Sequence, residues 1–215
     1  EELYGMWDTL NHPELEVEDT AACVIRFKNG AIGNIVVSNS QNPALFGNVR
    51  DKELFLRWAE SAVFTPIMRT HEGNRPDDCF QYYDDEHCMA ELARLVDIHV
   101  SIAPYIKGLV AENAAKGTPV QRPLFMHYEN DERSYVEQFE YLFGEDILVA
   151  PVWQAGQTER ECYLPSDGWT HLWSGVEYGQ GTCVVPAAMG DIPVFYKKGS
   201  AVASIMEEIR AKYAK

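Results

Sequence analysis

The spacing of apolar residues near the start of the chain predicts a β-hairpin. Between residues 20 and 28, side chains suited to a buried face recur at every second position, which is the period of a strand. Asn29 and Gly30 follow, the pair that favours a two-residue type I′ turn, and residues 31–38 return as a second strand. We therefore expect two antiparallel strands in this part of the chain.

The pattern becomes that of an α/β protein after residue 50. Apolar residues at spacings of three and four predict a helix over residues 51–60. Residues 62–68 form an apolar run of strand length, and we expect a buried strand there. Gly, Asn and Pro in residues 71–78 then indicate a loop.

A long helix is predicted to begin at Asp84 and Asp85 and to continue to Ala115. Acidic residues in a first turn suit the helix dipole. Pro104 predicts a kink or a break, and Gly117 supplies a residue suited to a helix C-terminus. One apolar stripe is expected along this helix, made of Leu92, Leu95, Val96, Ile98, Ile102, Tyr105, Ile106, Leu109 and Val110.

Short strand-like segments separated by turn signals follow residue 118, and this spacing favours an antiparallel β-sandwich. The predicted strands are residues 120–128, 146–152, 160–164, 169–173, 182–185 and 192–196. Charges alternate over residues 206–215, which predicts a solvated helical end. The fold class is therefore α/β plus all-β.

Composition narrows the class of protein. A formal net charge of −15 argues against a surface for nucleic acid or anionic membranes, which reward clustered Lys and Arg. No apolar run approaches the ~20 residues that span a bilayer, and no signal peptide opens the sequence. The five cysteines are odd in number and scattered, which favours reduced, mostly buried thiols in a cytoplasmic protein and no zinc site.

The most informative chemistry follows the predicted strand of residues 62–68, where Arg69, His71 and Glu72 come in quick succession. A buried parallel strand that ends in polar residues delivers them to the mouth of a barrel, where barrel enzymes keep their chemistry. An imidazole at this place can donate a hydrogen bond to a hydroxyl or to a carboxylate. A packing or surface role for His71, and a structural ion pair for Arg69, are the alternatives.

Three further motifs accompany this segment: residues 122–125 (RPLF), 144–152 (GEDILVAPV) and 192–196 (IPVFY). Together with Thr70-His71-Glu72-Gly73-Asn74-Arg75-Pro76 they resemble glycoside hydrolase family 31, in particular its sulfoquinovosidase branch. The resemblance runs from about residue 51 to about residue 204. It implies the last strand and helices of a (β/α)8 barrel (residues 51–118), a β-sandwich (119–204) and a helical tail (205–215).

The resemblance also implies a function, the hydrolysis of an α-glucoside or a sulfoquinovoside with retention and without a cofactor or metal. In such enzymes His71 would contact the sugar, and Arg69 and Glu72 would be substrate-binding or supporting residues. A retaining glycosidase needs two carboxylates about 5–5.5 Å apart. The family's two aspartates belong to segments before the matching part, so we expect no catalytic residue here and an inactive chain.

No other acidic residues in the sequence make a convincing substitute for the missing pair. The pairs Asp77-Asp78 and Asp84-Asp85 suit a loop and a helix start, and Glu145-Asp146 suits a turn. Trp153, Trp169 and Trp173 could form a carbohydrate platform, but core packing within a sandwich is favoured.

Residues 1–50 resemble a different family, the C-terminal domain of the glucose–fructose oxidoreductases and inositol dehydrogenases. The residues that carry this likeness are 17–22, 26–31 and 38–43. No Gly-x-Gly-x-x-Gly motif follows a strand, so no nucleotide cofactor is expected. The change of resemblance near residue 50 indicates a chimera.

Two other functions stay open at this stage: a non-catalytic carbohydrate-binding or scaffold module, and an oxidoreductase-family fragment. A partial barrel would also expose apolar faces, which predicts self-association.

Overall fold

The computed structural model describes residues 2–8, 20–26, 32–38, 51–70, 79–137 and 139–214. The chain divides into two compact units, Glu1–Val49 and Arg50–Lys215, and each is described by itself.

The smaller unit contains an antiparallel sheet in the order β1-β2-β3. Its strands are β1 (Glu2–Asp8), β2 (Thr20–Arg26) and β3 (Ile32–Ser38). Arg26 lies opposite Ile32, so the two strands predicted from alternation do pair as antiparallel neighbours. The predicted turn at Asn29 and Gly30 lies outside the described residues, and β1 was not predicted.

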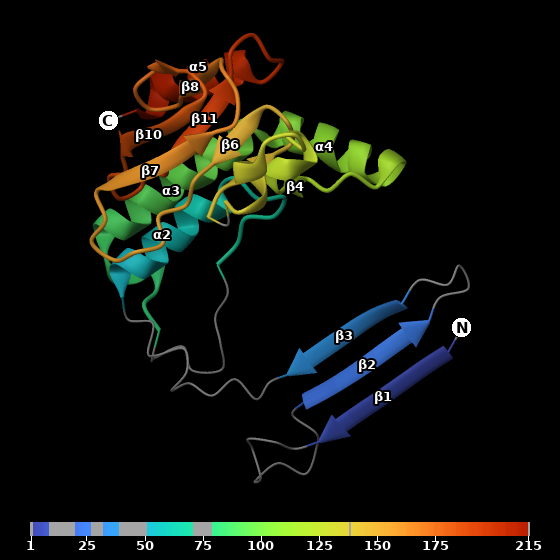
Figure 1. Ribbon diagram of the computed structural model, residues 1–215. Coiled ribbons are helices and arrows are strands. Elements are labelled where there is room, and N and C mark those ends of the chain that lie inside the picture. Colours follow the sequence, from blue (N-terminus) through green and yellow to red (C-terminus); the bar gives the residue numbers. More distant parts are fainter. Residues whose placement is uncertain are drawn as a thin grey trace. The chain divides into compact units, whose positions relative to one another are not determined.

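The larger unit begins with helices and continues with short strands (Figure 1). The helices are α2 (Lys52–Ala62), α3 (Glu86–Ser101), α4 (Ala103–Lys116) and α5 (Ala203–Tyr213), with 3₁₀ turns at Tyr82–Asp84, Leu124–Met126 and Glu132–Tyr135. The strands are β4 (Gln121–Arg122), β5 (Tyr141–Phe143), β6 (Ile147–Val149), β7 (Glu159–Leu164), β8 (Trp169–His171), β9 (Glu177–Tyr178), β10 (Gly181–Pro186) and β11 (Val194–Lys197).

Residues that cap or break helices predicted the helix limits closely. Asp51 caps α2 by accepting a hydrogen bond from the Glu53 amide at 2.8 Å. The predicted break occurs at Ile102, so α4 begins as a separate helix with Pro104 in its first turn. Gly117 ends α4 with φ of 75°, a backbone conformation that favours glycine.

The predicted strand over residues 62–68 is wrong. Ala62 is the last residue of α2, and the following residues form a turn and bends. A strand is stable only when a neighbour accepts its hydrogen bonds, and no described strand pairs with this segment. Its apolar residues are buried in another way, because Val63 and Phe64 pack into the core at the end of the helix.

Eight short strands of the larger unit form two sheets. Six of them have the order β4-β5-β6-β11-β8-β9, and β7 and β10 form a separate antiparallel pair. Residues alternate between two cores: Ile147 and Val149 belong to one hydrophobic cluster, whereas Leu148 between them belongs to the other.

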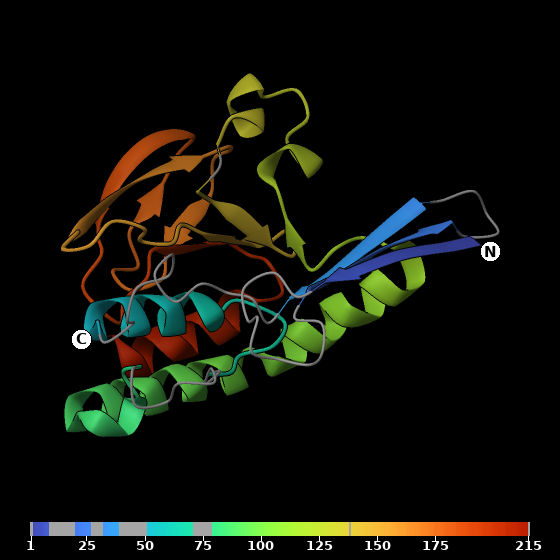
Figure 2. The same ribbon diagram turned by 90° about the horizontal axis from the view of Figure 1, so that it is seen from below.

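Each face of the six-stranded sheet is therefore covered. The helices α3, α4 and α5 pack with one face, and the β7–β10 pair packs on the other through residues such as Leu164 and Val185. Figure 2 shows α2, α3 and α5 gathered on one side of the strands. The predicted antiparallel β domain is present, with a helical layer that completes it.

Two further expectations need correction. Val96 and Val110 do not belong to the buried stripe of α3 and α4, because they are exposed. The C-terminal helix is not a solvated end, because Met206 and Ile209 are buried in the core. No helix in the described ranges combines the length and apolarity needed to cross a lipid bilayer.

Candidate functional site

The predicted sugar-contacting segment, Arg69 to Glu72, is separated by six residues from the end of α2. Arg69 is exposed at the surface, and His71 and Glu72 lie outside the described residues. The structure therefore leaves the meeting of these three side chains as a prediction. It does describe how the chain is held at the end of α2.

Two hydrogen bonds from distant elements fix the chain directly after α2. The Tyr141 hydroxyl of β5 donates to the Phe64 carbonyl at 2.9 Å, and Nδ1 of His99 on α3 lies 2.7 Å from the Val63 carbonyl. Burial raises the pKa of Tyr141 well above its ordinary value, so its hydroxyl keeps the proton that it donates. The chain directly after α2 is thus tied to both the sheet and a helix.

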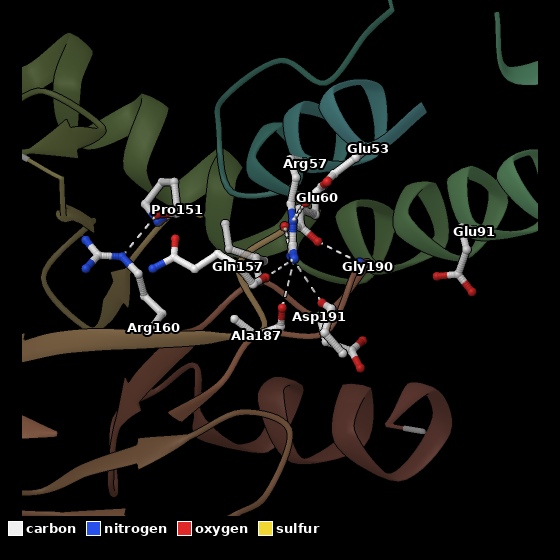
Figure 3. Close-up of polar contacts among 12 residues, drawn as sticks. Glu53, Arg57, Glu60, Glu91, Pro151, Gln157, Arg160, Ala187, Gly190 and Asp191 are labelled. Atoms are coloured by element: carbon white, nitrogen blue, oxygen red, sulfur yellow. Dashed lines mark hydrogen bonds and ion pairs between the residues drawn. The ribbon is translucent and has the colours of Figure 1, made fainter. Parts of the chain in front are cut away.

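A buried ion pair anchors α2 itself. Arg57 and Glu60 lie one turn apart, with Nη1 of the arginine 2.9 Å from Oε1 of the glutamate. The Gly190 amide donates to the second carboxylate oxygen at 2.7 Å, and Arg57 donates to the Ala187 carbonyl at 2.9 Å and the Gln157 carbonyl at 2.7 Å (Figure 3). Burial raises the pKa of Glu60 to about 7, and the nearby guanidinium opposes that rise.

The same short segment, residues 187–191, also holds α3. Arg94 donates to the Asp191 carboxylate at 2.8 Å and to the Gly190 carbonyl at 2.7 Å. It donates as well to the Tyr213 carbonyl at the end of α5, at 3.0 Å. We call residues 187–191 the anchor segment, because arginines from two helices converge on it.

A surface hollow of about 500 Å³ lies beside α2. Trp58 is 73% exposed at its edge, and Trp153 is 51% exposed and stacks on Phe139 with ring centroids 4.6 Å apart. The hollow is lined by Asp51, Glu53, Leu54, Arg57, Trp58, Ser61, Pro151, Val152, Trp153, Gln154 and Ala155.

The two carboxylates of this hollow already have structural roles. Asp51 caps α2, and Glu53 accepts a hydrogen bond from the Gly156 amide at 2.8 Å. The hollow therefore offers aromatic faces and hydrogen-bonding groups, which suit a sugar ring or an apolar partner better than acid–base chemistry.

The other acidic pairs in the described part of the chain serve turns and caps, as predicted for Asp84 and Asp85. Asp84 accepts a hydrogen bond from the Gln81 amide, and Asp85 caps α3 through the Cys88 amide, both at 2.8 Å. Glu145 is exposed and lies 3.7 Å from Nδ1 of His127. Asp77 and Asp78 lie outside the described residues.

Core packing is confirmed for two of the three tryptophans. Trp169 is fully buried, and the Trp173 indole donates to the Ile192 carbonyl at 2.7 Å beside the core. Trp153 is the exception, since it lies in the hollow. Across the described ranges, no group of three or more His, Cys, Asp or Glu side chains is placed to hold a metal ion.

Sequence reasoning missed the Arg57–Glu60 pair. The spacing of three residues on a helix is a signal for an ion pair, but nothing local indicates that the pair is buried. That property comes from the anchor segment, about 130 residues later in the chain.

Two family profiles match the chain: the glycosyl hydrolases family 31 TIM-barrel domain over residues 38–109 and the glycosyl hydrolase family 31 C-terminal domain over residues 117–202. The sulfoquinovosidase of Agrobacterium fabrum is 52% identical over 169 residues, which are 78% of this chain and 26% of that protein. The sulfoquinovosidase of Escherichia coli K12 is 45% identical over 78% of this chain and 25% of its own length.

Solved structures of family 31 enzymes are also similar to this chain. A family 31 sulfoquinovosidase from E. rectale, in complex with an aza-sugar inhibitor, has a TM-score of 0.75 and 61% identity over 77% of this chain and 25% of that one. An α-xylosidase from a soil metagenome, complexed with xylose, has a TM-score of 0.65 and 28% identity over 72% and 26%. The chain thus spans about a quarter of the length of these relatives.

Proposed function

Because the chain belongs to glycosyl hydrolase family 31, we propose that residues 51–204 are the C-terminal end of the barrel and the adjoining sheet domain of a retaining α-glycosidase for sulfoquinovosides. One observation carries the proposal: identity is 52% and 45% to two sulfoquinovosidases, against 32% to the α-glucosidase 2 of Bacillus thermoamyloliquefaciens. Hydrolysis of a plain α-glucoside is the alternative substrate choice.

In this proposal His71 binds the substrate by donating a hydrogen bond to a sugar hydroxyl, and Arg69 and Glu72 orient the loop that carries it. The hydrogen bonds from Tyr141 and His99 support this role by fixing the backbone at Val63 and Phe64, from which the chain reaches His71 seven residues later. A positioned donor contributes to the rate only when it is held in place before the substrate arrives.

We also propose that these 215 residues alone do not hydrolyse glycosides. Retention needs a nucleophile and an acid/base carboxylate that face each other across the scissile bond. The acidic pairs at residues 84–85 and 51–53 are occupied as caps and backbone acceptors. Release of p-nitrophenol from p-nitrophenyl α-sulfoquinovoside by the pure chain, above a heat-treated control, would overturn this part.

A graft tests the main proposal. Residues 51–204 replace the matching part of the Agrobacterium fabrum sulfoquinovosidase and, separately, of the Bacillus α-glucosidase. We expect the sulfoquinovosidase graft to cleave the p-nitrophenyl sulfoquinovoside and the glucosidase graft to be poorly active. Two folded grafts with equal activity on their hosts' substrates would contradict the assignment to sulfoquinovosides.

Within the active graft, His71→Ala should lower kcat/KM by about 10- to 100-fold, the usual loss for a hydrogen bond made to a reacting substrate. His87→Ala is the matched control, because His87 is exposed on α3 and should leave the rate unchanged. Equal effects of the two substitutions would remove His71 from the substrate site.

A second candidate function rests on the hollow beside α2. We propose that it can act as a non-catalytic surface for a sugar ring, supported by the exposed faces of Trp58 and Trp153. Titration of the 215-residue chain with glucose or sulfoquinovose should then change tryptophan fluorescence, and Trp153→Ala should abolish the change. An unchanged spectrum from a folded protein would eliminate this function.

Self-association is a third expectation. Trp58, Ile67 and Val100 are each more than 60% exposed, and exposed apolar surface favours association. Light scattering over a range of concentrations would decide, since a strictly monomeric protein contradicts it. The alternative that residues 1–50 make the chain an oxidoreductase-family fragment stays a hypothesis. It predicts that the chain binds NAD, and a binding measurement tests it.

A further inference from the structure

Two cysteines face each other across the small β7–β10 sheet. The register places Cys183 of β10 directly opposite Cys162 of β7. Residues directly opposite in an antiparallel pair project to the same side of the sheet. Both thiols are free, Cys162 is buried, and Cys183 is half-buried against the same hydrophobic cluster.

The hydrogen-bond pattern of β7 and β10 shows which kind of cross-strand pair the two cysteines form. The Ala187 amide donates to the Thr158 carbonyl at 2.8 Å, so these two residues form a hydrogen-bonded pair at the end of the ladder. Such pairs alternate with non-hydrogen-bonded ones, and Cys162 and Cys183 fall on the hydrogen-bonded positions. Pro186, which has no amide hydrogen, falls on a non-hydrogen-bonded position, as the pattern requires.

A hydrogen-bonded pair has its Cα atoms about 5.5 Å apart, which is inside the range of roughly 4.4–6.8 Å found for disulfides. Its Cβ atoms lie about 4.5–5.5 Å apart, slightly beyond the 3.5–4.5 Å that a relaxed disulfide needs. A bond between these sulfurs is therefore within reach but strained. Strained disulfides are the ones that thiol reductants reverse easily.

We propose that Cys162 and Cys183 are a reversible thiol modification site, which closes to a disulfide and clasps β7 to β10 when a low-molecular-weight disulfide such as oxidised glutathione is in excess. Cys183 is the entry point because it is the more accessible thiol. Its thiolate attacks glutathione disulfide, forms a mixed disulfide and releases one glutathione. The Cys162 thiolate then attacks the Cys183 sulfur and releases the second glutathione.

The electrons and protons of these two steps balance. Two protein thiols lose two electrons to glutathione disulfide, and their two protons end on the two glutathione thiols that are released. The Cys162 thiol gives up one contact, its 3.7 Å hydrogen bond to the Arg160 carbonyl.

The surroundings make the exchange slow near neutral pH. Burial and the neighbouring Glu140 raise the pKa of Cys183 to about 11, and burial raises the pKa of Cys162 further. The charged groups that act on Cys162 are Glu140, a Cys183 thiolate and Glu137, which disfavour its thiolate, and Arg160, which favours it. Equilibration at about pH 8.5 over many hours is the appropriate condition.

The disulfide would close a loop that contains β8 and β9. Strand β10 runs directly into the anchor segment, which accepts hydrogen bonds from Arg57 and Arg94. A disulfide here would hold the outer sheet in register next to that anchor. The expected consequence for the folded protein is a higher melting temperature, by roughly 3–8 °C.

The test uses the full 215-residue chain, reduced, then equilibrated with reduced and oxidised glutathione in different ratios, and quenched with iodoacetamide. Peptide mass mapping should show one linkage, Cys162 to Cys183, with loss of two hydrogen atoms, and dithiothreitol should reverse it. A glutathione adduct on Cys183 without the linkage would overturn the proposal. So would a dominant linkage through Cys23, Cys79 or Cys88.

A matched control is the double variant Cys183→Val with Val184→Cys, which exchanges two adjacent residues of β10. It keeps the composition but turns the thiol to the opposite side of β10, where residue 184 is exposed. We expect this variant to form glutathione adducts and no linkage to Cys162. Cross-linking equal to that of the natural order would show that register does not bring the thiols together. Circular dichroism is used to check that the natural protein and the exchanged variant are both folded. If the exchanged variant is not folded, Cys183→Ser replaces it as the control.

Discussion

Glu60 and Glu140 are both buried in the larger unit, with 0% and 6% of their surface exposed, but their surroundings differ. Glu60 has Arg57 and the Gly190 amide as partners for its two oxygens. Glu140 accepts one hydrogen bond, from the Tyr163 amide at 2.8 Å, and its other oxygen has no hydrogen-bond partner among the described residues.

The causes of the two pKa shifts reflect this difference. Burial is the largest influence on both carboxyls, and it raises the pKa of Glu60 to about 7 and that of Glu140 to about 8. Arg57 opposes the rise at Glu60, whereas the nearby Glu137 adds to the rise at Glu140. Depth alone does not set the charge of a buried carboxyl, because the nearest cation decides how much of the desolvation is offset.

The largest effect is expected from removing the cation. Arg57→Met leaves Glu60 buried without its partner and frees the Ala187 and Gln157 carbonyls, which should lower the free energy of unfolding by about 3–5 kcal/mol at pH 8. Urea denaturation measures this change. The double variant Arg57→Met with Glu60→Gln should recover much of the loss, and no recovery would show that the pair is not energetically coupled.

The second prediction concerns pH. A carboxyl whose pKa is raised by folding binds its proton more tightly in the folded state, so its contribution is complete below the unfolded pKa and is lost as pH rises through the folded pKa. Stability should therefore fall between about pH 4.5 and pH 8. Glu140→Gln keeps the acceptor for Tyr163 and should flatten the upper part of this fall, with a gain on the order of 2–4 kcal/mol at pH 9. Parallel curves for both proteins would contradict it.

A smaller effect should come from the neighbour of Glu140. Glu137→Gln removes a negative charge that raises the pKa of Glu140, and it keeps the oxygen that accepts from the Phe139 amide. We expect the pKa of Glu140 to fall and stability at pH 8 to rise by about 0.5–1 kcal/mol. The same substitution combined with Glu140→Gln should have no such effect, which is the control.

The smallest effect is expected at the surface. Lys52 donates to Asp85 at 2.6 Å, and this hydrogen bond is the main reason that the pKa of Asp85 is lowered, but both side chains are well exposed. Water screens such a pair. Lys52→Ala should leave the urea midpoint within experimental error, and a loss as large as that of Arg57→Met would refute the distinction between buried and exposed pairs.

The sequence predicted the parts of the fold that local signals control. Asp85, Pro104 and Gly117 act through their own backbone or the next turn, so the limits of α3 and α4 followed from them. The strand β7 was also found within one residue, because turn residues on both sides mark the limits of a short strand. The likeness to family 31 rested on motifs of the same local kind.

The sequence could not predict the contacts between residues that are far apart along the chain. An apolar run such as residues 62–68 can be buried as a strand or at a helix end, and only the availability of a pairing strand decides. The burial of Glu60 and Glu140 depends on Gly190 and Tyr163, which are distant along the chain. For the candidate site, Arg69 was placed on the surface, and the roles of His71 and Glu72 stay predictions.

The anchor segment has a consequence for how this domain can vary. Five residues without regular secondary structure receive hydrogen bonds from Arg57 and Arg94 and donate one to Glu60. Gly190 has φ of 90°, a conformation that other residues rarely adopt. A single inserted residue here would displace the bonding partners of two helices at once, so we expect this short turn to tolerate length changes far less than its irregular shape suggests.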